Sequence, residues 1–203
     1  MKVDVIQKTE TEAKFVLEGV KPSFASALRR VMMTEVPTMA IETIDFKKNG
    51  SALNDEIVAS RLGQIPLTFD KDFYELPPKE GKLAAKHQVK LVLKKKGPAM
   101  VYSGDLKSTA KDVKPLYDKI PIVELFEDQE LQFEATATLG VGREHIKWQG
   151  AVVGYSVDEK DPHKFTFNVE SVCGLTVEDV VDGAGKILEE KFSEFSKLVK
   201  KLK

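Results

Sequence analysis

A long apolar helix at the end of the chain is the feature that most constrains the fold. The spacing predicts a helix from Val177 to Leu202, and Thr176 with Asp179 forms a capping-box-like start in which the acid is one carbon shorter than the favoured Glu. At 1.5 Å per residue this helix would extend about 40 Å, which is at least the width of a small domain. We therefore expect its far end to outrun its own core.

The apolar stripe on this helix changes its spacing along the way. It begins with Val177, Val181, Ala184 and Leu188, and continues at heptad-like spacing with Phe192, Phe195, Val199 and Leu202. Burying such a side chain against another chain contributes about 1.5 to 3 kcal/mol. The residues that we expect to bind a partner are Leu188, Phe192, Phe195 and Val199. The alternative is that the helix folds back over its own sheet.

A second amphipathic helix is predicted after Pro22, with Ser23 as its N-cap. Its core stripe comprises Phe24, Ala27, Leu28, Val31 and Met32. A turn of about 100° per residue places Ser26, Arg29, Arg30 and Met33 on the opposite side. Two guanidinium groups beside an adaptable Met are unusual for a solvated face. We predict that Arg29, Arg30 and Met33 bind a partner; the alternative is that the arginines are ordinary surface residues.

Composition excludes several classes of protein. The 203 residues are 42% hydrophobic and 31% charged, enough for one domain with a real core or two small ones. A formal net charge of -1 gives no overall attraction to nucleic acid or to an anionic membrane. Neither a signal peptide nor a membrane span is expected, and a single cysteine, Cys173, fits a reducing compartment, so we expect a cytoplasmic protein.

Strands dominate the region between the two helices, and a hairpin precedes the first helix. The hairpin combines Val3 and Val5 with Phe15 to Val20, and half-buried strands are predicted at 39–46, 131–139 and 165–170. A short helix follows Asn54 as N-cap and ends at Gly63. Another hairpin is predicted from Val89 to Tyr102, with its turn at Lys95-Lys96-Gly97-Pro98.

Catalytic chemistry is scarce in the sequence. Glu144 beside His145 suggests acid–base work, but neighbours in sequence point in different directions and no third orienting group is evident. Cys173 and the three histidines lack paired ligand spacing, so we expect neither a zinc nor an iron–sulfur site. The basic and aromatic segment REHIKWQG, which contains the only tryptophan, Trp148, suits an interface as well as it suits a core.

Six ordered motifs together carry a resemblance to a known family. They are SALRRVMMTEVPTMAIE (26–42), NDEIVASRLGQIPL (54–67), VYSGDL (101–106), IPIVEL (120–125), LGVGREHIKWQ (139–149) and FTFNVESVCGLTVEDVV (165–181). In this order the chain resembles the D-type subunits of archaeal DNA-directed RNA polymerase, a family that includes the eukaryotic third-largest polymerase II subunit and, more distantly, the bacterial alpha amino-terminal domain.

The resemblance implies an α+β fold and a non-catalytic assembly platform. Residues 1–46 and 152–203 would form a discontinuous dimerisation domain, a sheet with two main helices, and 47–151 an inserted, mostly β domain. The implied partners are the small subunit L, as a heterodimer, the second-largest polymerase subunit and other core subunits, with little or no direct contact with nucleic acid and none with a membrane. Arg29 and Arg30 would meet the large subunits, and the segments of Arg61, His145, Lys147 and Trp148 would line the docking surface for the second-largest subunit.

Three departures from the family pattern qualify these expectations. Ser26 stands where the family commonly has Asn. The short turn Asp158 to Pro162 occupies the place of a cysteine-rich ferredoxin-like insertion, and no cysteine of an inserted zinc site follows Leu67 before Cys173. No cofactor is therefore expected, neither iron–sulfur cluster nor zinc. Two other classes remain open: a stand-alone homodimeric protein-binding module and an acid–base enzyme around Glu144 and His145.

Overall fold

The chain folds into two compact units, seen in a computed structural model that describes residues 1–78, 80 and 83–200. Unit 1 comprises residues 1–36 and 141–203, and unit 2 comprises residues 37–140. The first unit is thus built from both ends of the chain, and the second is inserted between them. This arrangement confirms the predicted α+β class with a discontinuous helical domain and an inserted β region.

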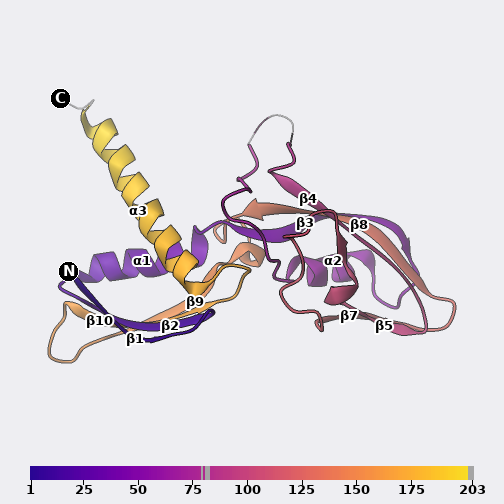
Figure 1. Cartoon of the computed structure of the whole chain (residues 1–203), viewed down its shortest axis with the longest axis horizontal. Coiled ribbons are helices and arrows are strands. Elements are labelled where there is room, and N and C mark those ends of the chain that lie inside the picture. The colour runs from indigo at the N-terminus through magenta and orange to yellow at the C-terminus, as the bar shows by residue number, and fades with distance from the viewer. Residues whose placement is uncertain (79, 81–82, 201–203) are drawn as a thin grey trace. The chain divides into compact units, whose positions relative to one another are not determined.

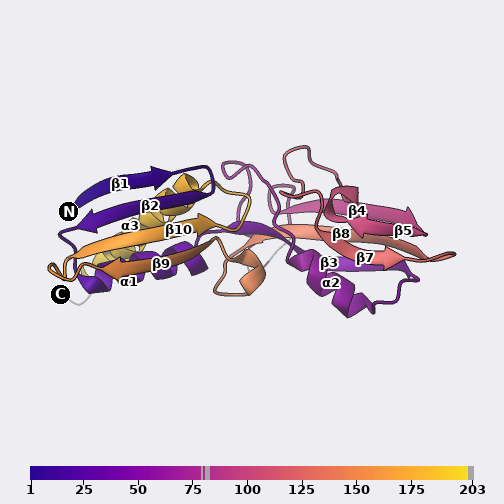
Figure 2. The ribbon, with the colours of Figure 1, turned by 90° about the horizontal axis from the view of Figure 1, so that it is seen from below.

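Unit 1 contains one four-stranded antiparallel sheet with the order β1-β2-β10-β9 (Figures 1 and 2). Its strands are β1 (Lys2–Lys8), β2 (Glu12–Glu18), β9 (Ala151–Val157) and β10 (Lys164–Ser171). The predicted hairpin at the start of the chain is confirmed, because Val3 pairs with Leu17 and Val5 with Phe15. Alternate residues of β2 and β10 are buried, and the Phe15 and Phe167 rings stack with centroids 5.2 Å apart.

Two helices cover one face of this sheet: α1 (Pro22–Thr34) and α3 (Val177–Val199) (Figure 1). In α1 the buried residues are Ala25, Leu28, Val31 and Met32, and Phe24 and Ala27 are partly buried. The N-cap is Lys21 with Pro22 at the first turn, so the prediction of Ser23 was wrong; the ring of Pro22 fixes the helical φ one residue earlier. The capping box of Thr176 and Asp179 at the start of α3 is confirmed.

Unit 2 contains a four-stranded sheet of order β3-β8-β4-β6 and a two-stranded sheet of β5 and β7 (Figure 2). The strands are β3 (Thr38–Asn49), β4 (Gln88–Lys96), β5 (Ala99–Tyr102), β6 (Lys107–Ser108), β7 (Pro121–Leu125) and β8 (Glu130–Gly140). The helix α2 (Asp55–Gly63) begins after its predicted N-cap Asn54, and the 3-10 helix η1 spans Ser103–Asp105. The core of this unit includes Leu62, Leu91 and Phe133.

The hairpin predicted between residues 89 and 102 was wrong. β4 pairs along its whole length with β8 and at two residues with β6, whereas β5 pairs with β7 in the other sheet. The long strand β8 lets β4 bury Val89, Leu91 and Leu93 in one continuous core, which the four residues of β5 cannot offer. Gly97 lies against the backbone of Phe126, where an added Cβ would come within 2.0 Å of a carbonyl oxygen.

The two units divide at Val36 and Gly140, whereas the sequence placed the boundaries at 46/47 and 151/152. The reason is strand pairing: Thr38 pairs with Gly140 and Asn49 with Leu131, so β3 and β8 form one ladder that belongs wholly to unit 2. Residues 141–151 belong to unit 1, because Arg143 and Val172 bond to backbone groups of that unit.

Candidate partner interface

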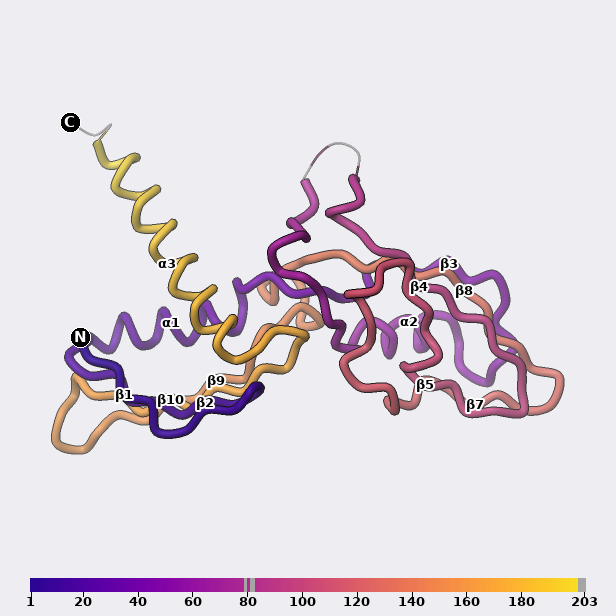
Figure 3. Tube along the Cα trace, in the orientation of Figure 1, coloured from indigo at the N-terminus to yellow at the C-terminus, as the bar shows by residue number. Residues whose placement is uncertain are grey.

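The helix α3 changes character halfway along its length. Val177, Val180, Ala184 and Leu188 are buried in the core of unit 1, and Val181 is partly buried. Beyond Leu188 the side chains are exposed: Phe192 is 62% and Phe195 64% accessible, and Val199 is half-buried. The Cα trace shows this end of α3 leaving the sheet of unit 1 (Figure 3). The helix therefore does not fold back over its own sheet, and Leu202 lies outside the described residues.

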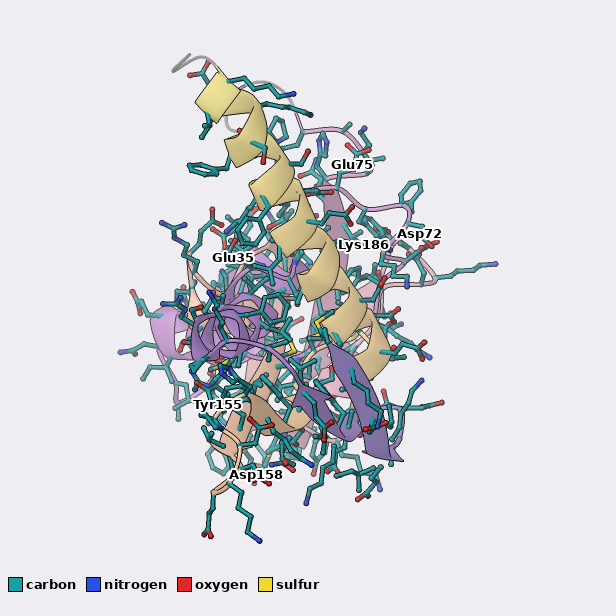
Figure 4. The ribbon with its side chains drawn as sticks, turned by 90° about the vertical axis from the view of Figure 1, so that its left-hand side faces the viewer. Glu35, Asp72, Glu75, Tyr155, Asp158 and Lys186 are labelled. Carbon is teal, nitrogen blue, oxygen red and sulfur yellow. The ribbon has the colours of Figure 1, made fainter. Side chains whose placement is uncertain are left out.

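An ion pair marks the place where α3 leaves the core. The Lys191 ammonium bonds to the carboxylate of Glu35, the residue that follows α1. Figure 4 labels Glu35 beside α3 and Lys186 on α3 itself. Lys186 in turn pairs with Asp182, one turn earlier, at 2.8 Å. The pair of Lys191 and Glu35 joins α3 to the end of α1, whereas the pair of Lys186 and Asp182 lies within α3.

An apolar groove of about 430 Å³ opens between the sheet and the first halves of both helices. Its walls come from β1 and β2 on one side and from α1 and α3 on the other; the apolar lining includes Val3, Val5, Phe24, Leu28 and Val181. Val3 and Val5 are 53% and 64% exposed although they share a face with the buried Leu17 and Phe15. The helices thus leave the β1 edge of the core uncovered.

Gly185 lies in this groove at an interior, exposed position of α3. A Cβ built on it would meet nothing within 4 Å. Glycine in a helix interior costs about 1 kcal/mol relative to alanine, so the residue is locally unfavourable and is not required by packing within this chain. Its position leaves space for the close approach of another chain.

The predicted face of α1 is only partly directed away from the core. Arg29 is half-buried, and its Nε donates a hydrogen bond to the backbone oxygen of Val153 in β9 at 2.8 Å. Met33 packs against the core of unit 1. The expectation that these two residues face away was therefore wrong. The periodicity of a helix gives the face on which a residue lies, but it does not show that another element, here the edge strand β9, packs beside that face. Arg30 is exposed, as expected.

Arg61 of α2 is exposed but also bonded within its own unit. One terminal nitrogen of its guanidinium donates to the backbone oxygen of Pro121 at 2.9 Å. It borders a shallow groove of about 290 Å³ lined largely by apolar residues that include Leu53, Met100 and Phe126. Arg61 therefore joins α2 to β7 and lies beside apolar surface at the same time.

The segment that follows β8 forms a tight loop around the 3-10 helix η2 (Ile146–Trp148). Trp148 is buried at 7% exposure, with the Lys147 ammonium 4.4 Å from the ring centroid and the His145 ring edge-on at 6.5 Å. His145 Nδ1 accepts a hydrogen bond from the backbone nitrogen of Lys147. Ile146, which the sequence did not single out, is 60% exposed.

The described residues offer little for metal or acid–base chemistry. Among them, no group of three or more His, Cys, Asp or Glu side chains is placed to hold a metal ion. The contacts of His145 are a backbone nitrogen and an indole ring, and neither can relay a proton. Burial raises the pKa of the Cys173 thiol, which makes it a poor nucleophile. Within the same residues, no helix is long and apolar enough to span a membrane.

The fold of unit 1, with the inserted unit 2, defines an α+β dimerisation domain with an inserted β region. Residues 14–192 match the model of the RNA polymerase Rpb3/Rpb11 dimerisation domain. The chain belongs to this family. The match includes both helices of unit 1 up to Phe192 and the whole of unit 2.

Archaeal proteins are among the similar curated sequences, each named DNA-directed RNA polymerase subunit Rpo3. The protein of Pyrococcus furiosus is 50% identical over 155 residues, covering 76% of this chain and 58% of the relative. That of Methanothermobacter thermautotrophicus is 46% identical over 154 residues, covering 73% and 58%, and that of Thermococcus kodakarensis 47% identical over 151 residues, covering 74% and 57%. The aligned part of this chain thus spans less than two thirds of the length of these relatives.

Proposed function

We propose that this chain is a non-catalytic assembly subunit of a DNA-directed RNA polymerase. It pairs in the cytoplasm with a small homologous subunit, called L in archaea, and the pair then docks the second-largest subunit and other core subunits. The family match and the Rpo3 relatives support the class of complex. The exposed end of α3 and the apolar groove support the contact with the small subunit, and the exposed cationic residues support the contact with the large subunits.

The observation that carries the proposal is the exposure of Phe192 and Phe195 on a helix whose first half is buried. Each such side chain would contribute about 1.5 to 3 kcal/mol when it is covered by a partner. The groove beside Gly185 supplies a second apolar surface on the same unit. A related partner with a projecting helix of its own would cover the groove while this helix packs on the partner.

The proposal assigns the cationic surfaces to the large subunits. Arg30 and the loop that contains His145 and Lys147 lie on unit 1, and Arg61 lies on unit 2. Exposed guanidinium groups bind carboxylates and backbone oxygens through charge-assisted hydrogen bonds. The subunit requires no cofactor of its own for this role, neither zinc nor an iron–sulfur cluster, and makes little or no direct contact with nucleic acid.

Purification of the tagged native protein from its own cells at moderate salt tests the proposal. We expect a small partner of the same family and the large polymerase subunits in the eluate, identified by mass spectrometry. The matched control is the Phe192→Asp, Phe195→Asp double variant, which should lose the small partner. Recovery of the wild-type chain without any polymerase subunit contradicts the proposal.

A homodimeric binding module is the second candidate, because one chain carries both an apolar groove and an exposed apolar helix end. Two copies could then cover each other reciprocally. The mass of the isolated chain, measured by light scattering over a tenfold dilution, separates the two candidates. A stable dimer of the isolated chain that does not exchange with the small subunit favours the homodimer.

A further inference from the structure

The larger sheet of unit 2 has one face on the core and one face open to solvent. On the core side, Leu91, Leu93 and Phe133 are buried. Residues of a strand alternate between the two faces, so their neighbours lie on the other side of the sheet. The outward residues of β4, which lies beside β8 (Figure 2), are all exposed: Lys90, Val92, Lys94 and Lys96.

Lysines dominate this open face. Six of them lie on it, and we call this surface the lysine face: Lys47, Lys48, Lys90, Lys94, Lys96 and Lys107. Three acids lie among them, and each already pairs with one lysine: Asp45 with Lys47, Glu130 with Lys48, and Glu134 with Lys90. Within the described residues, Lys94, Lys96 and Lys107 make no ion pair. Half of the positive charge of the face is therefore not neutralised by the chain itself.

A hollow of about 330 Å³ lies in the lysine face. Val92 contributes to its lining and is 40% exposed; it lies opposite Lys107 on one side and Glu134 on the other. Asp105 also borders the hollow, but its carboxylate already bonds to Lys95 at 2.5 Å. The hollow thus combines an exposed apolar side chain with ammonium groups that lack a carboxylate.

The excess of positive charge acts on a carboxylate of the same face. A hydrogen bond from Lys48, together with the charges of Lys96 and Lys94, holds the pKa of the Glu130 carboxyl below its ordinary value against the effect of partial burial. The whole chain has a formal net charge of -1, so the lysine face is a local excess. Exposed surfaces usually intersperse both signs of charge, and ordinary solvated lysines do not require such an excess.

We propose that the lysine face binds an acidic segment of a partner protein, which places an apolar side chain on Val92 and carboxylates on Lys94, Lys96 and Lys107. Outward residues of a strand lie about 7 Å apart, so alternate residues of an extended segment can match Val92, Lys94 and Lys96 in turn. Complementary charge gives such a contact its specificity and its rate of association. The inference goes beyond the proposed function, which assigns no contact to this face.

A protein segment fits this face better than a nucleic acid does. Asp45, Glu130 and Glu134 would repel a continuous row of phosphates, whereas a protein can place its own polar or basic residues there. A phosphate backbone would also cover Val92 with polar groups, which gains nothing from its exposed apolar surface.

Binding of a synthetic peptide to the full chain tests the proposal. The probe is fluorescein-labelled EEDTLTDEE, in which the leucine is flanked by acids at alternate positions, and its binding is measured by fluorescence polarisation. We expect saturable binding that weakens as salt is added. The Lys94→Ser, Lys107→Ser double variant should bind about tenfold more weakly. The Lys111→Ser, Lys119→Ser double variant, which removes the same charge from exposed loop positions of unit 2, is the matched control and should bind within about twofold of the wild-type chain.

Val92 separates the apolar contact from the charges. Val92→Thr keeps the branched shape but replaces a methyl by a hydroxyl group, so it should weaken peptide binding about threefold at every salt concentration. The same variant should bind an oligonucleotide of equal total charge as the wild-type chain does. All variants should keep the melting temperature of the wild-type chain in circular dichroism, because the substituted side chains are exposed.

The proposal is overturned if the peptide does not bind, or if a peptide with serine in place of leucine binds equally well. It is also overturned if the oligonucleotide binds more tightly than the peptide, which would make nucleic acid the partner, or if the two double variants lose equal affinity, which would leave only the total charge. None of these outcomes depends on whether polymerase subunits are recovered with the chain.

Discussion

Arg29 in α1 and Val153 in β9 are joined by a hydrogen bond from the guanidinium Nε to the backbone oxygen, 2.8 Å long. Val153 lies on the edge strand of the sheet, where one side of the backbone has no neighbouring strand. The arginine thus satisfies a backbone oxygen on the edge strand that would otherwise be free to accept a hydrogen bond from the strand of another chain. Its neighbour Arg30 is exposed, so two adjacent residues of one motif have different structural environments.

Replacement of each arginine by alanine should separate these roles. Arg29→Ala should lower the free energy of unfolding by about 1 kcal/mol, since a partly buried carbonyl loses its donor. Arg30→Ala should change it by less than about 0.5 kcal/mol, as is usual for exposed positions, while weakening recruitment of the second-largest subunit. Urea unfolding of the isolated chain measures the first effect, and stepwise assembly measures the second. Equal loss of stability in both variants would contradict the assignment.

Phe195→Asp should abolish pairing with the small subunit and leave the monomer folded. A carboxylate buried in an apolar interface without a partner is costly, whereas at a site that is 64% exposed in the monomer it is solvated. Size-exclusion chromatography with light scattering measures pairing, and circular dichroism measures the melting of the monomer. Ser193→Asp, on the same exposed stretch of α3, controls for added charge. Co-elution of Phe195→Asp with the partner would sink the prediction.

Gly185→Leu should stabilise the isolated chain and weaken its pairing. Leucine favours the helix by up to about 1 kcal/mol relative to glycine. Among the described residues, the added Cβ would meet no atom within 4 Å apart from its chain neighbours and the backbone of its own helix. In the complex, however, the same side chain would fill the apolar groove. Gly185→Ala is the graded control, with a similar gain in melting temperature and a smaller loss of affinity. The groove is not the pairing surface if Gly185→Leu pairs normally.

The ion pair of Asp105 and Lys95 gives unit 2 a pH-dependent stability. Partial burial by itself would raise the pKa of the Asp105 carboxyl, but hydrogen bonds from Lys95 at 2.5 Å and from the Tyr102 backbone at 2.8 Å outweigh it and hold this pKa below its ordinary value. The unfolded chain therefore takes up this proton first as the pH falls. The stabilisation is complete above the ordinary pKa of 3.8 and is lost as the pH falls through the folded value.

Asp105→Asn should accordingly lower the free energy of unfolding near neutral pH by about 1 kcal/mol. The difference in the free energy of unfolding between the variant and the wild-type chain should become smaller as the pH falls below 3.8. Denaturant titrations at several pH values measure both. A gap that stays constant down to pH values well below 3.8 would show that the carboxylate charge contributes nothing.

Local patterns predicted most of the helices and strands, because their signals lie within a few residues. The capping box at Thr176, the alternation of β8 and the apolar stripe of α3 are all of this kind. The false hairpin shows the limit: Val89 and Met100 flank a convincing turn, yet the best partner of β4 is a strand more than thirty residues away. Pairing between distant strands leaves no mark in a short window.

The candidate site was predicted less completely than the fold. The exposed end of α3 follows from helix length alone, and Phe192 and Phe195 lie where the stripe predicts. The burial of Trp148 and the exposure of Ile146 do not follow from sequence spacing, because a 3-10 turn decides which of two neighbouring apolar residues points inward. Gly142 follows the strand β8 in the sequence, but its close approach to the backbone oxygen of Met33 depends on the tertiary fold.

The pairing of Thr38 with Gly140 has a consequence for how such a chain can evolve. Residues paired across an antiparallel ladder lie about 5 Å apart, so the chain enters and leaves the inserted unit at two neighbouring points. The segment between these two points could be duplicated, deleted or replaced by an unrelated domain while the first unit kept its sheet, its helices and its own core. The first unit and the inserted unit are thereby free to change in sequence at different rates.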